Sequence, residues 1–318
     1  MNKEIGGYIE FEHYNGKHFH ENAFRLNCAR NCLVYLIKLN NIKHIYIPYF
    51  LCDSVSAVCK KYDTKVSFYH IDEKFLPILP DSDFTQDWIY IVNYYGQLTN
   101  QQISDYARKY KNLIVDNVQA FFQPPVEHVS TIYTCRKFFG VADGAYLYSD
   151  KKLKGKLEPD SSYNRMDFLL GRFEKTANEF YPQYTANNKL FKDEPVKLMS
   201  PLTENLMSSF EYERIEKVRT ENFEYLHKQL AKINKLELTV PNGAFTYPLF
   251  IDNGAEIRKK LQEDKIYIPT LWPYVFEICK ENDLEYQLAK NILPLPIDQR
   301  YGKEEMAYIT NRIKSCIN

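Results

Sequence analysis

The chain has 318 residues, which is long enough for one large α/β domain and a smaller one around sizeable buried cores. Lysine plus arginine equal aspartate plus glutamate at 41 each, so the charge balance argues against a main role at nucleic acid or a membrane surface, where a basic excess is needed. The many tyrosines (26) and phenylalanines (20) and the few glycines (11) favour a packed globular chain over a disordered or repetitive one.

The seven cysteines form no Cys-x-x-Cys pair, and the N-terminal residues contain no apolar stretch typical of a signal peptide. No window approaches the roughly 18 consecutive apolar residues of a membrane-spanning helix. We therefore expect a cytoplasmic protein whose cysteines are small core residues. The seven histidines show no His-x-x-x-His spacing, so we predict no metal site.

The first half of the chain alternates strand-like and helix-like segments. After a capping Asn27, the apolar spacing predicts a helix, and β-rich runs and helical patterns then follow in turn. The expected helices are 28–39, 54–62 and 104–110, and the expected strands are 44–50, 65–72, 87–96, 112–117, 130–140 and 144–150. This rhythm predicts a mainly parallel, doubly wound sheet.

The second half is less regular. Residues 155–200 are polar and broken, and we expect a peripheral helix and a loop there. A long amphipathic helix over 199–233, interrupted near 210, is expected to bridge two domains. The segments that follow predict a strand at 246–252, a helix at 255–264, a strand at 265–269 and a closing helix at 304–316. We therefore expect a large α/β domain over 1–215 and a small α+β domain over 216–318.

Three features carry chemistry, and their order is informative. The first is a helix N-terminus at Cys28, Ala29 and Arg30. The second is Asp116, at the carboxyl end of an apolar strand, which is the side on which open α/β sheets bind ligands. The third is Lys137, which lies one strand further on and so within reach of the same pocket.

Each feature has a use with pyridoxal phosphate (PLP). A carboxylate such as Asp116 keeps the pyridine nitrogen protonated, so that the ring can absorb electrons from the substrate. A lysine such as Lys137 forms the imine to the aldehyde and can then move a proton between carbon atoms. The phosphate needs backbone N–H donors, hydroxyls and positive charge. The candidates for these groups are residues 28–30, Thr134, and either Arg30 or Arg136.

The motifs around these residues resemble a known family. VDNVQAFF followed by TCRKFFGVADGAYLYSD resembles the Asp-x-x-Gln and Lys-x-x-Gly…Gly-Gly signatures of the DegT/DnrJ/EryC1/StrS family, the PLP-dependent aminotransferases of nucleotide-linked keto-sugars. VNYYGQLTN resembles the strand of that family that ends in His-x-Tyr-Gly, with Asn93 in place of the histidine. The resemblance extends in order over most of residues 20–318.

The resemblance implies an aspartate-aminotransferase-like PLP fold, a homodimer, and a role for each matching residue. Lys137 would form the Schiff base, Asp116 would pair with the pyridine nitrogen, and Gln119 would lie beside the phenolic oxygen of the ring. Cys28, Ala29 and Arg30 would hold the phosphate, with help from Thr134. An aromatic residue of the Tyr49-Phe50 turn or of Tyr94-Tyr95 would stack on the ring, and the sequence does not choose between Phe50 and Tyr94.

Several positions depart from the family pattern. Cys28-Ala29-Arg30 replaces a Ser-Gly-Thr turn, which removes a hydroxyl and adds a cation, and the Gly-x-Asn-x-Arg-Met segment has only a partial echo at 163–166. Substrate contacts are harder to assign, and the candidates are Asn93, Tyr95 and Arg300. The alternative for Arg300 is an ion-paired loop with Asp298, and we prefer this alternative slightly.

Three functions remain open. The first is transamination, in which glutamate gives its amino group to a nucleotide-linked keto-sugar or a related ketone. The second is a PLP-dependent lyase or dehydratase on the same fold, although sugar dehydratases of the family carry histidine at the position of Lys137. The third is a non-catalytic binding or regulatory protein, which the altered phosphate turn would permit.

Overall fold

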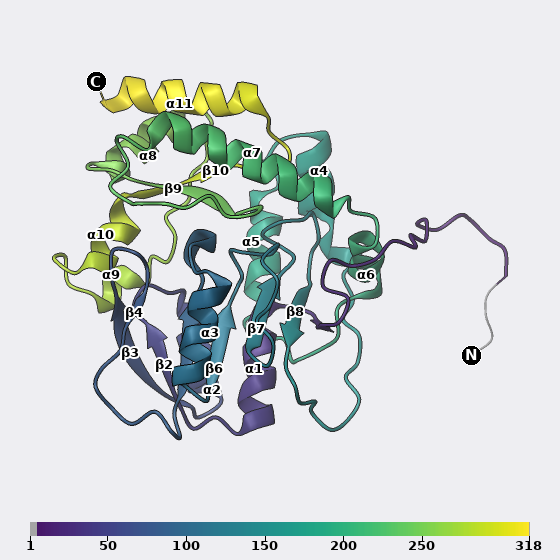
Figure 1. Ribbon diagram of the computed structural model, residues 1–318. Coiled ribbons are helices and arrows are strands. Elements are labelled where there is room, and N and C mark those ends of the chain that lie inside the picture. The colour runs from purple at the N-terminus through teal and green to yellow at the C-terminus, as the bar shows by residue number, and fades with distance from the viewer. Residues whose placement is uncertain (1–4, 318) are drawn as a thin grey trace.

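The computed structural model describes residues 5–317, and an eight-stranded sheet forms its centre (Figure 1). The strands lie in the order β1-β8-β7-β6-β5-β2-β3-β4. Their bounds are β1 Phe24–Leu26, β2 His44–Pro48, β3 Lys65–Ile71, β4 Pro77–Ile78, β5 Trp88–Val92, β6 Leu113–Asp116, β7 Ser130–Thr134 and β8 Ala145–Tyr148. Strands β3, β2, β5, β6 and β7 pair in parallel, and β8, β1 and β4 pair antiparallel at the two sides. The predicted mainly parallel sheet is therefore confirmed.

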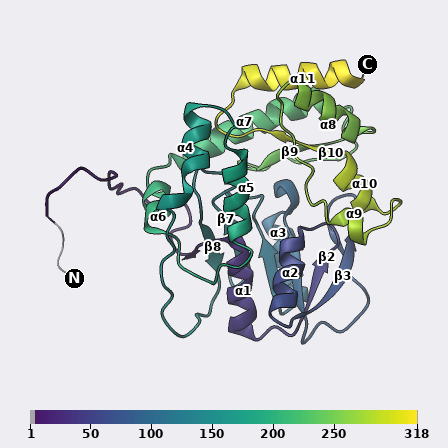
Figure 2. The ribbon, with the colours of Figure 1, turned by 180° about the vertical axis from the view of Figure 1, so that it is seen from behind.

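Helices cover both faces of this sheet. α3 (Asn100–Lys109) lies on one face, and α1 (Ala29–Asn40) and α2 (Asp53–Lys61) lie on the other, as the two opposite views show (Figures 1 and 2). Because strand side chains alternate between faces, Ile89 and Val115 pack towards α3, whereas Tyr90 and Ile114 belong to the core beneath α1 and α2. Four cysteines, Cys28, Cys32, Cys59 and Cys135, are buried and free, as expected for small core residues.

The middle of the chain forms more helix than expected. It contains the 3-10 turns η1 (Tyr94–Gly96) and η2 (Tyr163–Arg165) and the helices α4 (Asp167–Glu174), α5 (Tyr181–Leu190), α6 (Pro201–Met207) and α7 (Tyr212–Leu230). The break near 210 in the predicted long helix is confirmed, because α6 ends before α7 begins. The expected strand at 130–140 is shorter than predicted, since the chain turns after Thr134.

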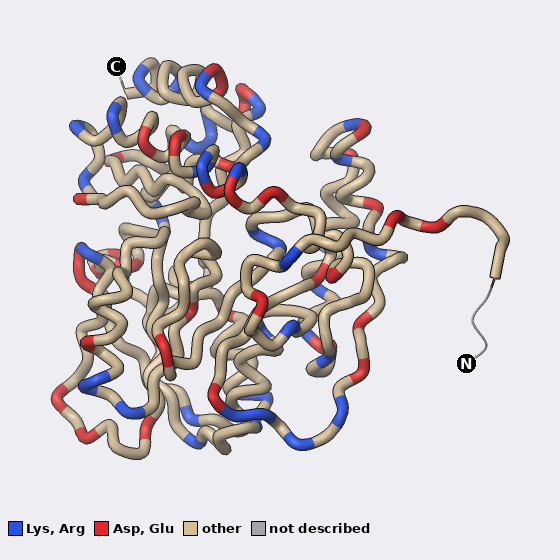
Figure 3. The backbone as a smooth tube through the Cα atoms, turned by 45° about the vertical axis from the view of Figure 1, so that its right-hand side comes forward, with Lys and Arg blue, Asp and Glu red and all other residues tan. Residues whose placement is uncertain are grey.

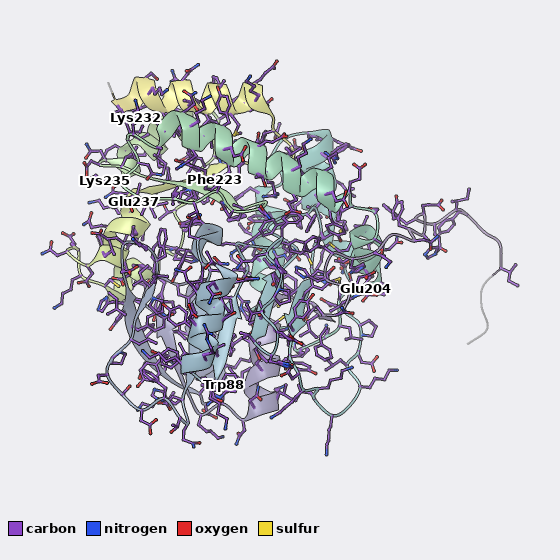
Figure 4. All side chains as sticks on the ribbon, in the orientation of Figure 1. Trp88, Glu204, Phe223, Lys232, Lys235 and Glu237 are labelled. Carbon is purple, nitrogen blue, oxygen red and sulfur yellow. The ribbon has the colours of Figure 1, made fainter. Side chains whose placement is uncertain are left out.

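The C-terminal part packs above the carboxyl ends of the parallel strands (Figure 1). Its elements are β9 Thr246–Phe250, α8 Gly254–Glu263, α9 Val275–Ile278, α10 Leu284–Asn291, β10 Ile292–Pro296 and α11 Lys303–Ile317. Together with α7, the elements β9, α8, β10 and α11 enclose a separate hydrophobic core, in which the ring of Phe223 (labelled in Figure 4) lies 4.9 Å from that of Tyr247. The buried hydrophobic residues of α9 and α10 belong instead to the core of the large sheet.

One predicted strand was wrong. Residues 265–269 are not a strand, although buried Ile266 and Ile268 alternate with more exposed residues as a strand would. β9 pairs instead with β10, antiparallel from Ile292 opposite Phe250 to Pro296 opposite Thr246. Strand β10 was not predicted from the sequence, because it contains two prolines, and proline lacks the N–H that donates in a β-sheet.

Two further features bear on function. In the view of Figure 3, lysine and arginine are interspersed with aspartate and glutamate along much of the backbone. In the part of the chain that the structure describes, no helix is long and apolar enough to cross a membrane.

Candidate active site

Asp116 is the last residue of β6, and its carboxylate is buried, with 4% of the residue exposed. The hydroxyl of Tyr90, on neighbouring β5, donates to Oδ2 over 2.7 Å, and the backbone N–H of Val118 donates to Oδ1 over 2.9 Å. Burial raises the pKa of this carboxyl above its ordinary value, and the positive charge of Lys137 opposes that shift. A buried carboxylate of this kind favours a positively charged group on a ligand.

Lys137 lies in the turn that follows β7. This turn is closed by the backbone N–H groups of Phe138 and Phe139, which both donate to the carbonyl of Cys135. The Lys137 Nζ lies 5.3 Å from the centroid of the Phe245 ring. Burial lowers the pKa of Lys137, and Asp116 opposes this shift. Strands β6 and β7 are parallel neighbours, so Asp116 at the end of β6 and Lys137 just after β7 lie at the same edge of the sheet. Each charge acts on the pKa of the other.

The loop that carries Lys137 is anchored to the C-terminal part. The carbonyl of Phe138 accepts hydrogen bonds from Gln299 Nε2 over 2.7 Å and from Arg219 Nη2 over 3.2 Å. Arg219 is buried in α7, and its other nitrogens donate to Gln299 and to the carbonyls of Ala244 and Phe245. The position of Lys137 therefore depends on residues more than 80 positions further along the chain.

Gln119 presents an unpaired donor at the site. Its side-chain Oε1 accepts from the backbone N–H of Tyr95 over 2.8 Å, whereas Nε2 is buried without a partner among residues 5–317. The hydroxyl of Tyr95 is likewise buried without a partner there, and the backbone of Tyr95 is left-handed with φ 55°. Unsatisfied buried donors are costly, so this arrangement favours a ligand with an oxygen acceptor.

The N-terminus of α1 is open to an anion. Cys28 is the N-cap residue without a side-chain capping bond, and the first turn contains no acidic residue. Burial raises the pKa of the Cys28 thiol to about 11, so the thiol is neutral near pH 7. Arg30 Nη1 and Arg136 Nε are buried without partners in the described chain. Thr134 is buried at the end of β7, next to the same loop.

The two aromatic candidates lie together. The ring centroids of Phe50 and Tyr94 are 5.3 Å apart, and Tyr94 donates its hydroxyl to the carbonyl of Phe50 over 2.6 Å. Trp272, from the C-terminal part, meets Phe50 edge-on at 4.5 Å. Phe50 and Tyr94 thus form one buried cluster, which contacts both parts of the chain.

Asn93 and Arg300 have partners within the protein. Asn93 Nδ2 donates to Asn117 and Gln123, and its Oδ1 accepts from the N–H of Leu98, so its polar atoms are satisfied without a ligand. Arg300 forms a bidentate ion pair with Asp298 at 2.6 and 2.9 Å, which is the arrangement of the ion-paired loop. Both side chains are thus engaged by other residues of the chain.

Sequence reasoning missed Tyr90 and Arg219. Tyr90 lies on the strand next to that of Asp116 and on the same face, so the alternation of the two parallel strands was the available signal. Arg219 lies four residues after Ile215 and four before Phe223, so its place on the apolar face of α7 was the available signal. Among residues 5–317, no group of three or more His, Cys, Asp or Glu is placed to hold a metal ion.

The residues present fit PLP. Nine buried side-chain atoms lack a hydrogen-bond partner in the described chain, and four of them belong to Gln119, Tyr95, Arg30 and Arg136. The donor of Gln119 matches a phenolic oxygen and those of Arg30 and Arg136 match a phosphate, while Asp116 and Lys137 match a protonated ring nitrogen and an aldehyde. The hydroxyl of Tyr95 is influenced by the charge of Arg258.

Comparison with known proteins gives a likeness of fold. No protein-family profile and no curated protein sequence matches the chain. Among solved structures, the chain is similar to DesV of S. venezuelae in complex with a ketimine intermediate, with 13% identity, a TM-score of 0.64, and coverage of 92% of this chain and 84% of that one. It is also similar to NtdA of Bacillus subtilis with bound cofactor PMP, with 13% identity, a TM-score of 0.64, and coverage of 92% and 72%.

A third similar structure is a DegT DnrJ EryC1 StrS aminotransferase from Brucella abortus, with 13% identity, a TM-score of 0.60, and coverage of 92% and 85%. The expected fold class is thereby confirmed. Over nine-tenths of its length, the chain has the fold of the sugar aminotransferases of the DegT/DnrJ/EryC1/StrS type.

Proposed function

We propose that the protein is a PLP-dependent aminotransferase that transfers an amino group from glutamate to a nucleotide-linked keto-sugar or a related ketone. Lys137 is the residue that holds the cofactor covalently. The proposal rests on one observation above all, which is that buried Asp116 ends β6 and half-buried Lys137 follows the end of the neighbouring parallel strand β7. The similar structures include sugar aminotransferases, and two of the similar structures are a PLP form and a PMP-bound form, which supports the same activity.

Each side chain has a task in this proposal. PLP, when bound, supplies an electron sink for the carbon that exchanges its amino group. Asp116 would hold the ring nitrogen protonated, and the unpartnered Nε2 of Gln119 would be the donor for the phenolic oxygen. Lys137 Nζ moves the proton between carbon atoms, because its lowered pKa makes the neutral amine easier to reach.

The remaining site residues position the cofactor and the substrate. Phe50 or Tyr94 stacks on the ring, and Cys28, Ala29, Arg30 and Thr134 surround the phosphate. Asn93 supports the site through its hydrogen bonds to neighbouring residues. Tyr95 and Arg300 remain the candidates for substrate contacts.

The proposed organisation is a large domain over 1–215 and a small domain over 216–318. The separate hydrophobic core of the C-terminal part supports this division. We propose that the enzyme is a cytoplasmic homodimer.

The altered phosphate turn keeps two other functions open. Cys28-Ala29-Arg30 lacks the hydroxyls of a Ser-Gly-Thr turn, so a non-catalytic binding or regulatory protein is the main competitor. A PLP-dependent lyase or dehydratase is the other, and the presence of Lys137 favours transamination over it.

The decisive experiment is an absorption spectrum of the purified protein with PLP, before and after glutamate. The wild type is compared with Lys137→Ala and with the control Lys232→Ala, whose lysine is exposed just beyond the end of α7 (labelled in Figure 4). We expect a band near the visible edge that glutamate bleaches in the wild type and the control, and no such band in Lys137→Ala.

The other outcomes separate the competing functions. A band that no amino donor bleaches supports the lyase or the non-catalytic binder. The absence of any band in the wild type contradicts the proposed cofactor.

A further inference from the structure

Two arginines, Arg136 and Arg165, lie over one aromatic ring, and a third, Arg30, lies in the first turn of α1 beside Cys28. Arg30 belongs to the first turn of α1, and Arg136 lies on the loop after β7. The guanidinium carbon of Arg136 is 4.7 Å from the centroid of the Phe191 ring, and that of Arg165 is 5.3 Å from the same centroid. The charges of Arg30 and Arg136 both act on the thiol of Cys28, and Arg165 acts on Arg136.

Each of these arginines has an N–H group without an acceptor. Arg30 Nη1, Arg136 Nε and Arg165 Nη1 are all buried and have no partner among residues 5–317. The side chain of Arg165 is only 10% exposed, so water does not readily satisfy it. Buried donors in protein interiors almost always have partners, and three such donors in one region indicate a ligand with several oxygen atoms.

The cluster also has an excess of positive charge. Asp160 accepts from Arg165 Nη2 over 2.9 Å, and Lys197 pairs with Glu194 at 2.6 Å and with Asp160 at 3.4 Å. Two carboxylates thus balance Arg165 and Lys197, which leaves Arg30 and Arg136 without a carboxylate at ion-pair distance in the described part of the chain. Arg136 Nη2 donates to the neutral side chain of Asn188. Burial lowers the pKa of Arg136, which is the expected sign of a cation without enough opposing charge. The end of α1 adds the positive pole of its helix dipole.

We propose that Arg30, Arg136 and Arg165 together bind the phosphate group of the cofactor, with Arg165 supplied by the segment between β8 and α6. This inference rests on the proposed function. A guanidinium presents paired donors to phosphate oxygens, so three of them replace the hydroxyl donors that Cys28 and Ala29 do not provide. The segment is fixed in place because Asn187 Nδ2 donates to the carbonyl of Ala142 over 2.8 Å.

A phosphate of the substrate is the rival occupant. Arg165 borders a cavity of about 210 Å³ between α4 and α5, where a nucleotide-linked substrate would also meet its free N–H group. The cofactor is favoured because Arg136, over the same aromatic ring as Arg165, precedes Lys137 directly in the chain.

The test compares PLP with pyridoxal, which has the same ring and aldehyde but no phosphate. Both affinities are measured by spectroscopic titration of the cofactor-free wild type, Arg165→Met, Arg136→Met and the control Arg172→Met, whose arginine is exposed on α4. We expect Arg165→Met and Arg136→Met each to weaken PLP binding by about 10- to 100-fold and to leave pyridoxal binding unchanged. Arg172→Met should behave as the wild type for both.

Inorganic phosphate provides a second readout that does not depend on the lysine. It should raise the melting temperature of the cofactor-free wild type and raise that of Arg165→Met less, while Arg165→Lys should fall between them. This series also reveals a folding defect, since a misfolded variant would have a lowered melting temperature without phosphate.

Two results would overturn the inference. One is equal PLP affinity in the wild type and Arg165→Met. The other is weakened binding of uridine diphosphate in Arg165→Met with PLP binding intact, which would assign Arg165 to the substrate. If the wild type binds neither PLP nor pyridoxal but phosphate stabilises it through Arg165, the phosphate site stands and the proposed aminotransferase function fails.

Discussion

The hydroxyl of Tyr90 donates a hydrogen bond to Oδ2 of Asp116 over 2.7 Å, across two adjacent parallel strands. Both side chains are buried in the layer under α1 and α2. The hydroxyl of Tyr69, on β3, in turn donates to the backbone carbonyl of Tyr90 over 2.8 Å, so Tyr90 is also held from two strands away in the sheet. A hydrogen bond to a charged group stabilises the charged form, and the Tyr90 bond therefore lowers the pKa of Asp116 against the effect of burial.

Replacing Tyr90 with phenylalanine should weaken Asp116 as the partner of the ring nitrogen. A hydrogen bond to a charged group contributes about 1.5–3 kcal/mol, so we expect kcat to fall by about 10- to 100-fold with little change in KM. The pH dependence of the cofactor absorbance should shift in the same variant. Tyr69→Phe is the matched control, because it removes a buried hydroxyl whose acceptor is a neutral carbonyl. Equal losses in the two variants would contradict a role specific to Asp116.

Asp116→Asn should stabilise the cofactor-free protein while abolishing transamination. Burial raises the pKa of the carboxyl, so the folded protein binds this proton more tightly than the unfolded chain does. The stability of the wild type then increases as the pH falls through the raised pKa towards 3.8, and the charged form is unfavourable at pH 7. We expect denaturant unfolding at pH 7 to show a gain on the order of 1–3 kcal/mol for the asparagine variant. A loss of stability at pH 7 would mean that Lys137 and Tyr90 fully compensate the buried charge.

Arg219→Met should destabilise the protein and misplace Lys137. Methionine fills similar space but leaves the buried carbonyls of Phe138 and Ala244 short of donors. Each buried unsatisfied group costs about 1–3 kcal/mol, so we expect a loss of at least about 2 kcal/mol in denaturant unfolding. Arg214→Met, in the exposed first turns of the same helix, should change stability by less than about 0.5 kcal/mol. A small loss for Arg219→Met would show that Gln299 alone supports the loop.

The sequence predicted the large sheet well because its central strands are continuous apolar runs between turn residues. Such runs arise where both faces of a strand are buried, and β5 and β6 meet that condition. The C-terminal sheet was predicted only in part. β9 is apolar and was found, whereas β10 was missed because Pro294 and Pro296 resemble a loop.

Some residues of the candidate site were also found from the sequence, and others were missed. Asp116 and Lys137 were predictable because their positions follow from strand ends and from chain order. Tyr90 was missed, because a tyrosine in a buried strand is usually interpreted as a core residue and because its acceptor, Asp116, lies on another strand. Arg165 lies in the polar segment 155–200, in which no helical spacing of apolar residues predicts α4 or α5. Its position near Arg136 depends on how that segment folds back onto the sheet.

His20 should make the fold sensitive to mild acid. It is buried, with Nε2 in hydrogen-bond contact with the carbonyl of Phe121 at 2.9 Å and Nδ1 in contact with the hydroxyl of Tyr148 at 3.2 Å. Burial lowers the pKa of this imidazole from 6.5 to about 4, so the unfolded chain binds its proton more readily than the folded protein does. Stability from this group is therefore complete above pH 6.5 and is lost progressively as the pH falls towards 4, by at most about 3 kcal/mol.

Substitution of His20 by glutamine tests this dependence, since glutamine donates to the same carbonyl but does not titrate. Denaturant unfolding between pH 7 and pH 4.5 should show a smaller loss for His20→Gln than for the wild type. Burial also lowers the pKa of nearby His18, so part of the acid sensitivity should remain in His20→Gln. The double variant of His18 and His20 should lose less stability in acid than His20→Gln alone. Exposed His128→Gln is the control and should follow the wild type. If His20→Gln loses stability with falling pH as steeply as the wild type, other groups than this imidazole control the acid response.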